Sequence, residues 1–347
     1  MQLEYEKVKT LLGEYCKTAY AKERASNLRI HTKKEFIDLE LKQSYEYKLL
    51  LQTGQYFHND FILNLVGELK LLAIPGAMLS GEQFLHIRKL AENTGSIFRW
   101  FDNERRIAYP ALKRVIEDTW FEKKIIILID EILDESGNVK DSASEALTRI
   151  RMNLYRKRNE LRRIFDRMVT KLNKLGYLAD IEESFINGRR VLAVFAEQKR
   201  MIKGILHGES DSRRTSFIEP EETTGLNNDI FSLENEERKE IYKILRQLTV
   251  TISAYAPLLK SYQDIAGEFD FICAKAKWAI LLGGNYPQVR DKAHLHLIQA
   301  YHPLLLIYNK NNNKPTVPVN ITLNENNRIL VISGPNAGGK TVTLKTV

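Results

Sequence analysis

The chain has 347 residues, with 52 Lys or Arg against 44 Asp or Glu, a formal charge of +8 and 44% hydrophobic residues. This hydrophobic content excludes a mainly disordered protein, and the length favours two or three domains. The first residues are charged, and the longest aliphatic run covers only residues 125–129, so we expect neither secretion nor a membrane span. Cys16 and Cys273 lie far apart without metal-like spacing, which is typical of free thiols in the cytoplasm.

Residues 1–145 are predicted to form a helical core. Their apolar positions recur at helical spacing and are interrupted at Pro75-Gly76 and at Tyr109-Pro110. Residues 126–131 spell four apolar residues followed by Asp-Glu, which resembles a Walker B strand. Because the helical phasing continues through Ile132 and Leu133, we interpret this segment as a helix.

Two long apolar stripes predict an antiparallel helical arm. The first stripe runs from Leu147 to Leu175, within a predicted lever helix at residues 146–178, and corresponds to roughly 40 Å of helix. The second stripe runs from Leu226 to Ile280, within a predicted lever helix at residues 223–284, and could reach roughly 80 Å if unbroken, although Pro257 should kink it. Gly283-Gly284 should end the second helix. Because about fifty residues separate the stripes, we expect an insertion at the far end of the arm.

The insertion, residues 179–222, is predicted to be β-rich. Asn187-Gly188 lies between two apolar runs, which is a strong signal for a hairpin with a two-residue turn. Residues 201–207 and 214–218 predict a second pair of strands, which Pro220 should end.

The positive charge is concentrated in the first arm helix and the insertion. Residues 149–219 contain 17 Lys or Arg against 9 Asp or Glu, so the rest of the chain sums to zero. A local surplus of this size is typical of a surface that binds a polyanion, because neutralised phosphates release counterions. For the helical part, residues 149–174, a solvated helix face is the simpler interpretation. For the insertion we predict contact with nucleic-acid phosphates through Arg189, Arg190, Lys199, Arg200, Lys203, Arg213 and Arg214.

Residues 285–347 predict the start of a domain of a different class. Residues 303–308, 317–323 and 328–333 are short strand candidates separated by polar loops. His294 and His296 with Asp291 could suggest a metal site, but no third ligand has suitable spacing, and we expect none.

The strand candidate at residues 328–333 leads into the pattern G-x-x-x-x-G-K-[ST], which is a phosphate-binding loop. Its backbone N–H groups can face the phosphates of ATP, Lys340 can reach the β- and γ-phosphates, and the Thr341 hydroxyl can bind Mg²⁺. The predicted ATP-binding residues are Gly334, Pro335, Asn336, Ala337, Gly338, Gly339, Lys340, Thr341 and Val342. The sequence ends shortly afterwards, before any Walker B acid or signature motif, so we expect these residues alone to be inactive in ATP hydrolysis.

Several of these motifs together resemble the MutS family of ABC-type ATPases, and in particular its second bacterial branch, MutS type two. They lie at residues 137–144, 204–207, 215–220, 302–305 and 332–345. The resemblance implies a helical core, lever helices, a β clamp at the lever tip, and an ATPase that works as a homodimer on DNA. The chain departs from the family pattern at Tyr301, where Arg is usual, and at residues 212–215 of the clamp.

We therefore predict a mainly α protein with a helical core, long antiparallel lever helices, a small inserted β clamp, and the first strands of an α/β P-loop ATPase domain. The expected function is ATP-dependent clamping of branched or structured DNA in repair or recombination control, with ATP and Mg²⁺ as cofactors. Mismatch reading is not expected, because the two Phe-x-Glu sequences, at Phe195 and Phe217, both fall on clamp strands. Two alternatives stay open: the same clamp acting on stalled ribosomes or RNA, and a non-enzymatic coiled-coil scaffold.

Overall fold

The computed structural model describes residues 4–335 and 338–347, and in residues 180–182 the backbone alone. The described part is mainly helical with two small antiparallel sheets, which confirms the predicted fold class. The chain divides into two units. Unit 1 comprises Met1–Ala73, His86–Ile126 and Ala254–Val347, and unit 2 comprises Ile74–Leu85 and Ile127–Ser253.

Unit 1 is built around one buried helix, α11 (Ala256–Leu282), which is apolar on most of its circumference. Phe269 and Ile272 pack with Tyr47 and Phe57 in one cluster, and Phe271 packs in a second cluster against the first two helices. The other elements of this unit are α1 (Tyr5–Glu14), α2 (Ala19–Ser26), α3 (Lys34–Thr53), α4 (Val66–Leu72), α6 (Asn103–Ala108), α7 (Pro110–Lys113), β5 (Leu295–Ala300), α12 (Pro303–Asn311), β6 (Val319–Leu323) and α13 (Lys340–Thr346). Two helices, α5 (Gly81–Trp100) and α8 (Lys124–Ile132), run across the boundary between the units.

A buried carboxylate fixes the start of α2 to α11. The Asp270 side chain accepts hydrogen bonds from the Lys17 and Thr18 backbone N–H groups, at 2.8 and 2.7 Å, and from the Thr18 hydroxyl at 2.9 Å. Thr18 is also the N-cap of α2, since its hydroxyl accepts from the Ala21 N–H. One acid thus satisfies donors that would otherwise be buried without partners.

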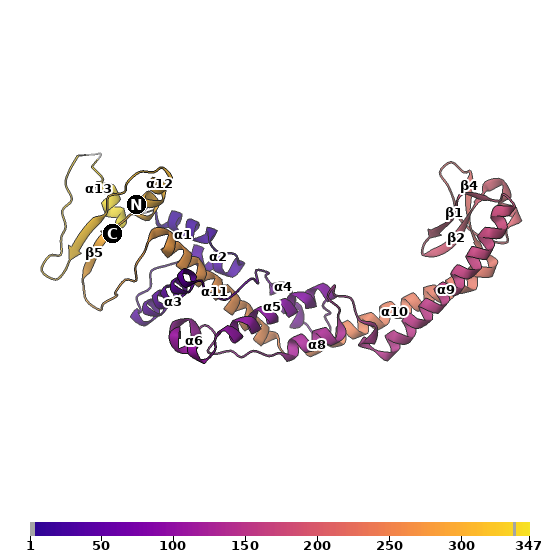
Figure 1. Cartoon of the computed structure of the whole chain (residues 1–347), viewed down its shortest axis with the longest axis horizontal. Helices are drawn as coiled ribbons and strands as arrows, with labels where there is room; N and C mark the ends of the chain where they lie inside the picture. The colour runs from indigo at the N-terminus through magenta and orange to yellow at the C-terminus, as the bar shows by residue number, and fades with distance from the viewer. Residues whose placement is uncertain (1–3, 336–337) are drawn as a thin grey trace. The chain divides into compact units, whose positions relative to one another are not determined.

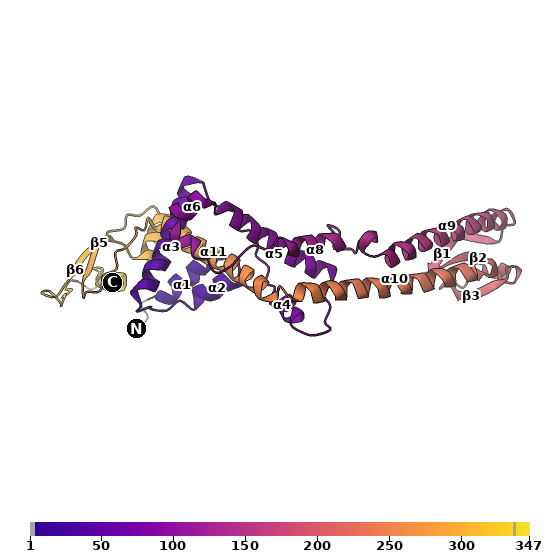
Figure 2. The same ribbon diagram turned by 90° about the horizontal axis from the view of Figure 1, so that it is seen from below.

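Unit 2 contains the long helical arm, formed by α9 (Glu145–Lys174) and α10 (Glu221–Ser253). The two helices run side by side in both views (Figures 1 and 2). The second predicted stripe is divided in the structure, because α10 ends at Ser253 and α11 begins at Ala256. Pro257 lies in the first turn of α11, where its missing N–H costs nothing. The break therefore falls just before the proline at which a kink was predicted.

Between α9 and α10 the chain forms a four-stranded antiparallel sheet with the order β1-β2-β4-β3. Its elements are β1 (Leu178–Ile186), β2 (Arg189–Phe195), the 3-10 helix η2 (Ala196–Met201), β3 (Gly204–Glu209) and β4 (Thr215–Pro220). The predicted hairpin is confirmed: Ile186 pairs with Arg189 across a two-residue turn in which Asn187 and Gly188 both have positive φ, 52° and 78°. This is the backbone geometry that an Asn-Gly turn favours.

The segment at residues 126–131 is helical, as predicted, because it lies within α8. Ile125 and Ile129, one turn apart, are fully buried on one side of this helix. Asp130 and Glu131 therefore occupy the end of a helix and not the end of a strand.

The strand predictions after residue 285 need three corrections. Residues 303–308 form helix α12, because His302 accepts the Leu305 N–H as N-cap and Pro303 occupies the first helical position. The strand that pairs with β6 is β5, which was not predicted. Residues 328–333 form no strand in the described chain. No described segment pairs with them, and a strand needs a neighbour for its hydrogen bonds, so Ile329 and Val331 stay more than 80% exposed.

Candidate nucleotide loop and nucleic-acid interface

The four-stranded sheet is anchored to the arm by a shared hydrophobic core. Leu192 and Val194 of β2 and Ile218 of β4 pack with Phe165 of α9 and Ile230 of α10. Phe165, Leu192 and Val194 are completely buried. The sheet and this end of the arm therefore form one packed body, and its surface charges have defined positions.

The most deeply buried charge in this body is Glu219 of β4, whose side chain has no exposed surface. Arg189 Nη1 donates to both carboxylate oxygens, at 2.8 and 3.1 Å. Asn227 Nδ2 donates at 2.9 Å, and His207 Nε2 lies 2.6 Å from Oε2. Arg189 also reaches Asn228 of α10 at 2.6 Å. Glu219 thus ties three elements together, and nothing in the spacing of the sequence indicated this cluster.

Arg190 is also held within the protein. Its guanidinium makes two hydrogen bonds of 2.8 Å to Glu183 and lies 4.8 Å above the ring of Phe165. Only 13% of its side chain is exposed. Contact of Arg189 and Arg190 with phosphates stays a prediction, but a phosphate would have to compete with carboxylates that each guanidinium already binds.

The other five predicted bases are more accessible. Lys199 pairs with Glu209 at 3.0 Å on the surface, a pair that contributes little to stability. In the described part of the chain no acid pairs with the exposed side chains of Arg200, Lys203, Arg213 and Arg214. These four flank the strands, on η2 and its following turn and on the turn before β4. Of the predicted set, they are therefore the residues best placed to meet a polyanion.

The arm helices are joined by ion pairs along their contact. Arg151 binds Glu237 at 2.7 Å, Arg158 binds Glu234 at 2.7 Å, and Lys157 binds Asp229 at 2.8 Å. Each pair takes its base from α9 and its acid from α10. Part of the positive surplus predicted for this region is therefore neutralised by the partner helix.

The predicted phosphate loop connects residues 328–333 to α13. Asn336 and Ala337 lie outside the described residues. Gly334 and Gly339 have φ values of 147° and 81°, in the region that favours glycine, and Gly339 is the N-cap residue of α13. A Cβ on Gly338 would lie 3.1 Å from the Pro335 carbonyl oxygen. The loop thus uses its glycines where a side chain would be strained or crowded.

Lys340, Thr341 and Val342 form the first turn of α13. The Lys340 ammonium group donates a hydrogen bond to the Gly334 carbonyl, so the lysine folds back over the loop to its first glycine. Thr341 is exposed at the surface. A cation at the mouth of the loop and a free hydroxyl beside it are the groups that the phosphates and Mg²⁺ of a nucleotide require, so the residues fit the predicted ligand.

The remaining sequence hypotheses concern metals, thiols and membranes. Among the described residues, no group of three His, Cys, Asp or Glu could hold a metal ion, and His296 Nδ1 lies 2.8 Å from the Thr322 hydroxyl. Cys16 and Cys273 are free thiols, and burial raises the pKa of Cys16 to about 12. No helix within the described ranges is long and apolar enough to span a membrane.

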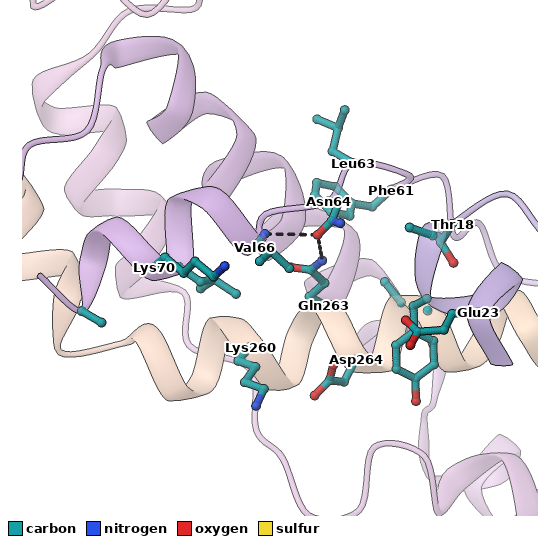
Figure 3. A pocket seen from close by; sticks show the side chains of 16 residues that line it. Thr18, Glu23, Phe61, Leu63, Asn64, Val66, Lys70, Lys260, Gln263 and Asp264 are labelled. Atoms are coloured by element: carbon teal, nitrogen blue, oxygen red, sulfur yellow. Dashed lines mark hydrogen bonds between the residues drawn. The ribbon is translucent and has the colours of Figure 1, made fainter. Parts of the chain in front are cut away.

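Unit 1 also contains a cavity of about 400 Å³ beside α11. Figure 3 shows Phe61, Leu63 and Val66 on one side, with Asp264 and Lys260 on α11 below. The Gln263 amide group donates to Asn64 at 2.9 Å within its wall. None of the residues predicted to bind ATP or nucleic acid lines this cavity.

A helical arm carrying a small antiparallel sheet, followed in the sequence by a G-x-x-x-x-G-K-T loop, is the organisation implied by the resemblance to the MutS class of ATPases. No protein-family model matches the chain. Proteins called Endonuclease MutS2 match its whole length. That of Aquifex aeolicus (strain VF5) is 31% identical over 347 residues, which are 100% of this chain and 44% of that protein. That of Lactococcus lactis subsp. lactis (strain IL1403) is 32% identical over 345 residues, 99% of this chain and 43% of that protein.

A third relative, Endonuclease MutS2 of Geobacillus sp. (strain WCH70), is 30% identical and covers 99% of the chain. These similarities confirm the resemblance to the MutS family, and the chain is a MutS2-like member of it. The chain spans less than half the length of the relatives it matches.

Proposed function

We propose that this chain is the nucleotide-binding and nucleic-acid-gripping part of a MutS2-like ATPase that acts on branched or structured DNA in repair or recombination control. The observation that carries the proposal is the complete G-x-x-x-x-G-K-T loop at residues 334–341, in a chain similar to MutS2 proteins along its whole length. The cationic surface of unit 2 supplies the second half of the proposal, because DNA binding without sequence reading needs bases that can reach phosphates.

In this proposal Lys340 and Thr341 hold the nucleotide. The Lys340 ammonium group exchanges the Gly334 carbonyl for phosphate oxygens, and the Thr341 hydroxyl binds Mg²⁺. Bound MgATP would supply a phosphoryl group for hydrolysis by the full-length homodimer. ATP can change the grip on DNA only if it binds the open and closed states with unequal affinity, because a ligand that binds both states equally shifts neither.

The nucleotide half is tested by Lys340→Ala in the full-length protein, with binding of a fluorescent ATP analogue as the measurement. We expect the loss of detectable binding with unchanged helical content. The matched control is Lys310→Ala on the exposed end of α12, which removes the same charge outside the loop and should bind ATP normally. Normal affinity in Lys340→Ala would reject the assignment of the loop.

The nucleic-acid half is tested by replacing the four free bases around the strands with glutamine: Arg200→Gln, Lys203→Gln, Arg213→Gln and Arg214→Gln. DNA affinity should fall equally for unrelated sequences, and each lost phosphate contact should reduce the salt dependence by about 0.9 in log–log slope. Replacing Arg189 or Arg190 is a poorer test, because their carboxylate partners would lose their counter-charges. Unchanged affinity would place the DNA contact elsewhere.

A further inference from the structure

The outward face of α9 carries a row of cations that the ion pairs with α10 do not use. We call this the outer row, and it consists of Arg149, Arg156, Arg163, Arg167, Lys171 and Lys174. All six side chains are exposed, and none forms an ion pair in the part of the chain that the structure describes. At 100° per residue they fall within a sector of about 80° on the side of the helix away from its apolar stripe.

This row is poorly explained as an ordinary solvated face. Exposed helix faces usually mix acids and bases, because opposite charges one turn apart stabilise a helix and like charges destabilise it. In the sector of the outer row there are two acids, Glu145 in the first turn of α9 and Glu160, against six bases. Arg163 and Arg167 are neighbours at i,i+4, as are Arg167 and Lys171, so the pattern is unfavourable for the isolated helix.

Part of the row has a local explanation and part has none. Lys171 and Lys174 lie in the last turn of α9, where the negative end of the helix dipole favours cations. Arg149, Arg156, Arg163 and Arg167 lie before that turn and gain little from it. Two of them, Arg149 and Arg167, make only long hydrogen bonds of 3.3 Å to carbonyl groups one turn earlier on α9.

We infer that the outer row binds the phosphodiester backbone of a nucleic-acid duplex that lies along the arm. Arg149 and Lys174 are 25 positions apart, or about 38 Å along the helix, which is close to one turn of duplex DNA, about 34–36 Å. Four of the six are arginines, whose guanidinium groups can hold phosphate oxygens in a bidentate manner. This inference rests on the proposed function and extends the gripping surface from the strands along the arm.

The difference in charge between the two arm helices favours binding of the duplex on the α9 side. The sequence of α9 contains ten bases and three acids, whereas α10 contains seven acids and four bases. A duplex is therefore attracted to α9 and repelled by much of α10. This difference also provides a control, because Arg238, Lys239, Lys243 and Arg246 are exposed bases on the acidic helix.

The test compares three variants of the full-length protein, each losing four positive charges. The outer-row variant carries Arg149→Gln, Arg156→Gln, Arg163→Gln and Arg167→Gln. The control variant carries Arg238→Gln, Lys239→Gln, Lys243→Gln and Arg246→Gln, and the third is the variant of the free bases around the strands described above. Glutamine keeps a good helix propensity, so circular dichroism should show unchanged helical content.

Binding is measured by fluorescence anisotropy with a labelled 30-base-pair DNA duplex, and with an RNA duplex of the same sequence, between 50 and 300 mM salt. We expect the outer-row variant to bind about 100-fold more weakly at 100 mM salt, with a log–log salt slope reduced by about 3.6, or about 0.9 for each of the four lost contacts. The α10 control should change affinity less than threefold. A loss on one kind of duplex alone would identify that kind as the ligand.

Two results would overturn the inference, and they differ in what they say about the proposed function. If the outer-row variant behaves like the α10 control while the strand-base variant loses affinity, the outer row is only a solvated face and the proposed grip stands. If the unmodified full-length protein binds neither duplex, the proposed function itself fails.

Discussion

Glu219→Gln should weaken the attachment of the sheet to the arm, although the hydrophobic core between them remains, because it neutralises the acid at the centre of a cluster of donors. The substitution keeps the shape of the side chain but replaces one carboxylate oxygen with an amino group. Arg189, His207 and Asn227 would then face a single acceptor oxygen, and the Arg189 guanidinium would lose its counter-charge.

The size of the effect follows from the burial of the partners. Removing one member of a buried ion pair costs about 3–5 kcal/mol. Arg189 and His207 keep 25% and 18% of their side-chain exposure, so solvent recovers part of that loss. We therefore expect a destabilisation near the lower end, about 3 kcal/mol, which corresponds to roughly a 100-fold increase in opening of the sheet.

Native-state hydrogen exchange is the suitable assay, since it reports the opening of β2 and β4 separately from unit 1. The matched control is Glu209→Gln on β3, an exposed acid whose pKa is lowered by its hydrogen bond with Lys199. The control should leave exchange in β2 and β4 unchanged. Equal exchange rates in Glu219→Gln and Glu209→Gln would refute the role given to the buried acid.

Three further expectations concern unit 1. Burial lowers the pKa of His302 below its usual 6.5, so the folded state favours the neutral ring. The stability that this ring contributes is therefore lost as the pH falls below about 6.5. We expect faster amide exchange in α12 in acid, and the His302→Gln variant should not show this pH dependence. Because its pKa is raised to about 12, Cys16 should react with a thiol reagent at pH 8 only after unfolding, and rapid labelling of the native chain would contradict this. Gly267→Ala should destabilise the folded protein by about 1–3 kcal/mol, because the new Cβ would lie 2.5 Å from the Tyr20 ring. Gly13→Ala, whose Cβ would meet no neighbour, should instead stabilise α1 by about 0.5–1 kcal/mol. Thermal unfolding of both variants measures the difference.

The parts of the fold that the sequence predicted are those fixed by local patterns. The Asn187-Gly188 turn follows from the backbone preferences of two residues, and the two arm helices follow from apolar periodicity over about 30 residues each. The helix at α8 was recognised for the same reason, since its apolar phase continued beyond the Asp-Glu pair.

Some of the errors arose where a distant or missing neighbour decides the structure. Residues 328–333 have the composition of a strand but lack a described partner. The error at residues 303–308 is of a different kind, because the helix start at His302-Pro303 is a local signal and the apolar residues after it also fit a strand. In the candidate site, spacing showed that bases were concentrated in the insertion. Spacing could not show that Glu219 and Glu183 bind two of these bases, Arg189 and Arg190, because the ion pairs form only once the strands are in register.

The ion pairs of the arm also imply an order of assembly. Lys157 and Asp229 are 72 positions apart, and the separation rises to 76 for Arg158 with Glu234 and to 86 for Arg151 with Glu237. Each pair farther from the sheet closes a longer loop, so its formation costs more chain entropy unless the nearer pair has already formed. We therefore expect the hairpin at Asn187-Gly188 to form first. The two long helices should then pair progressively, starting at the end next to the sheet.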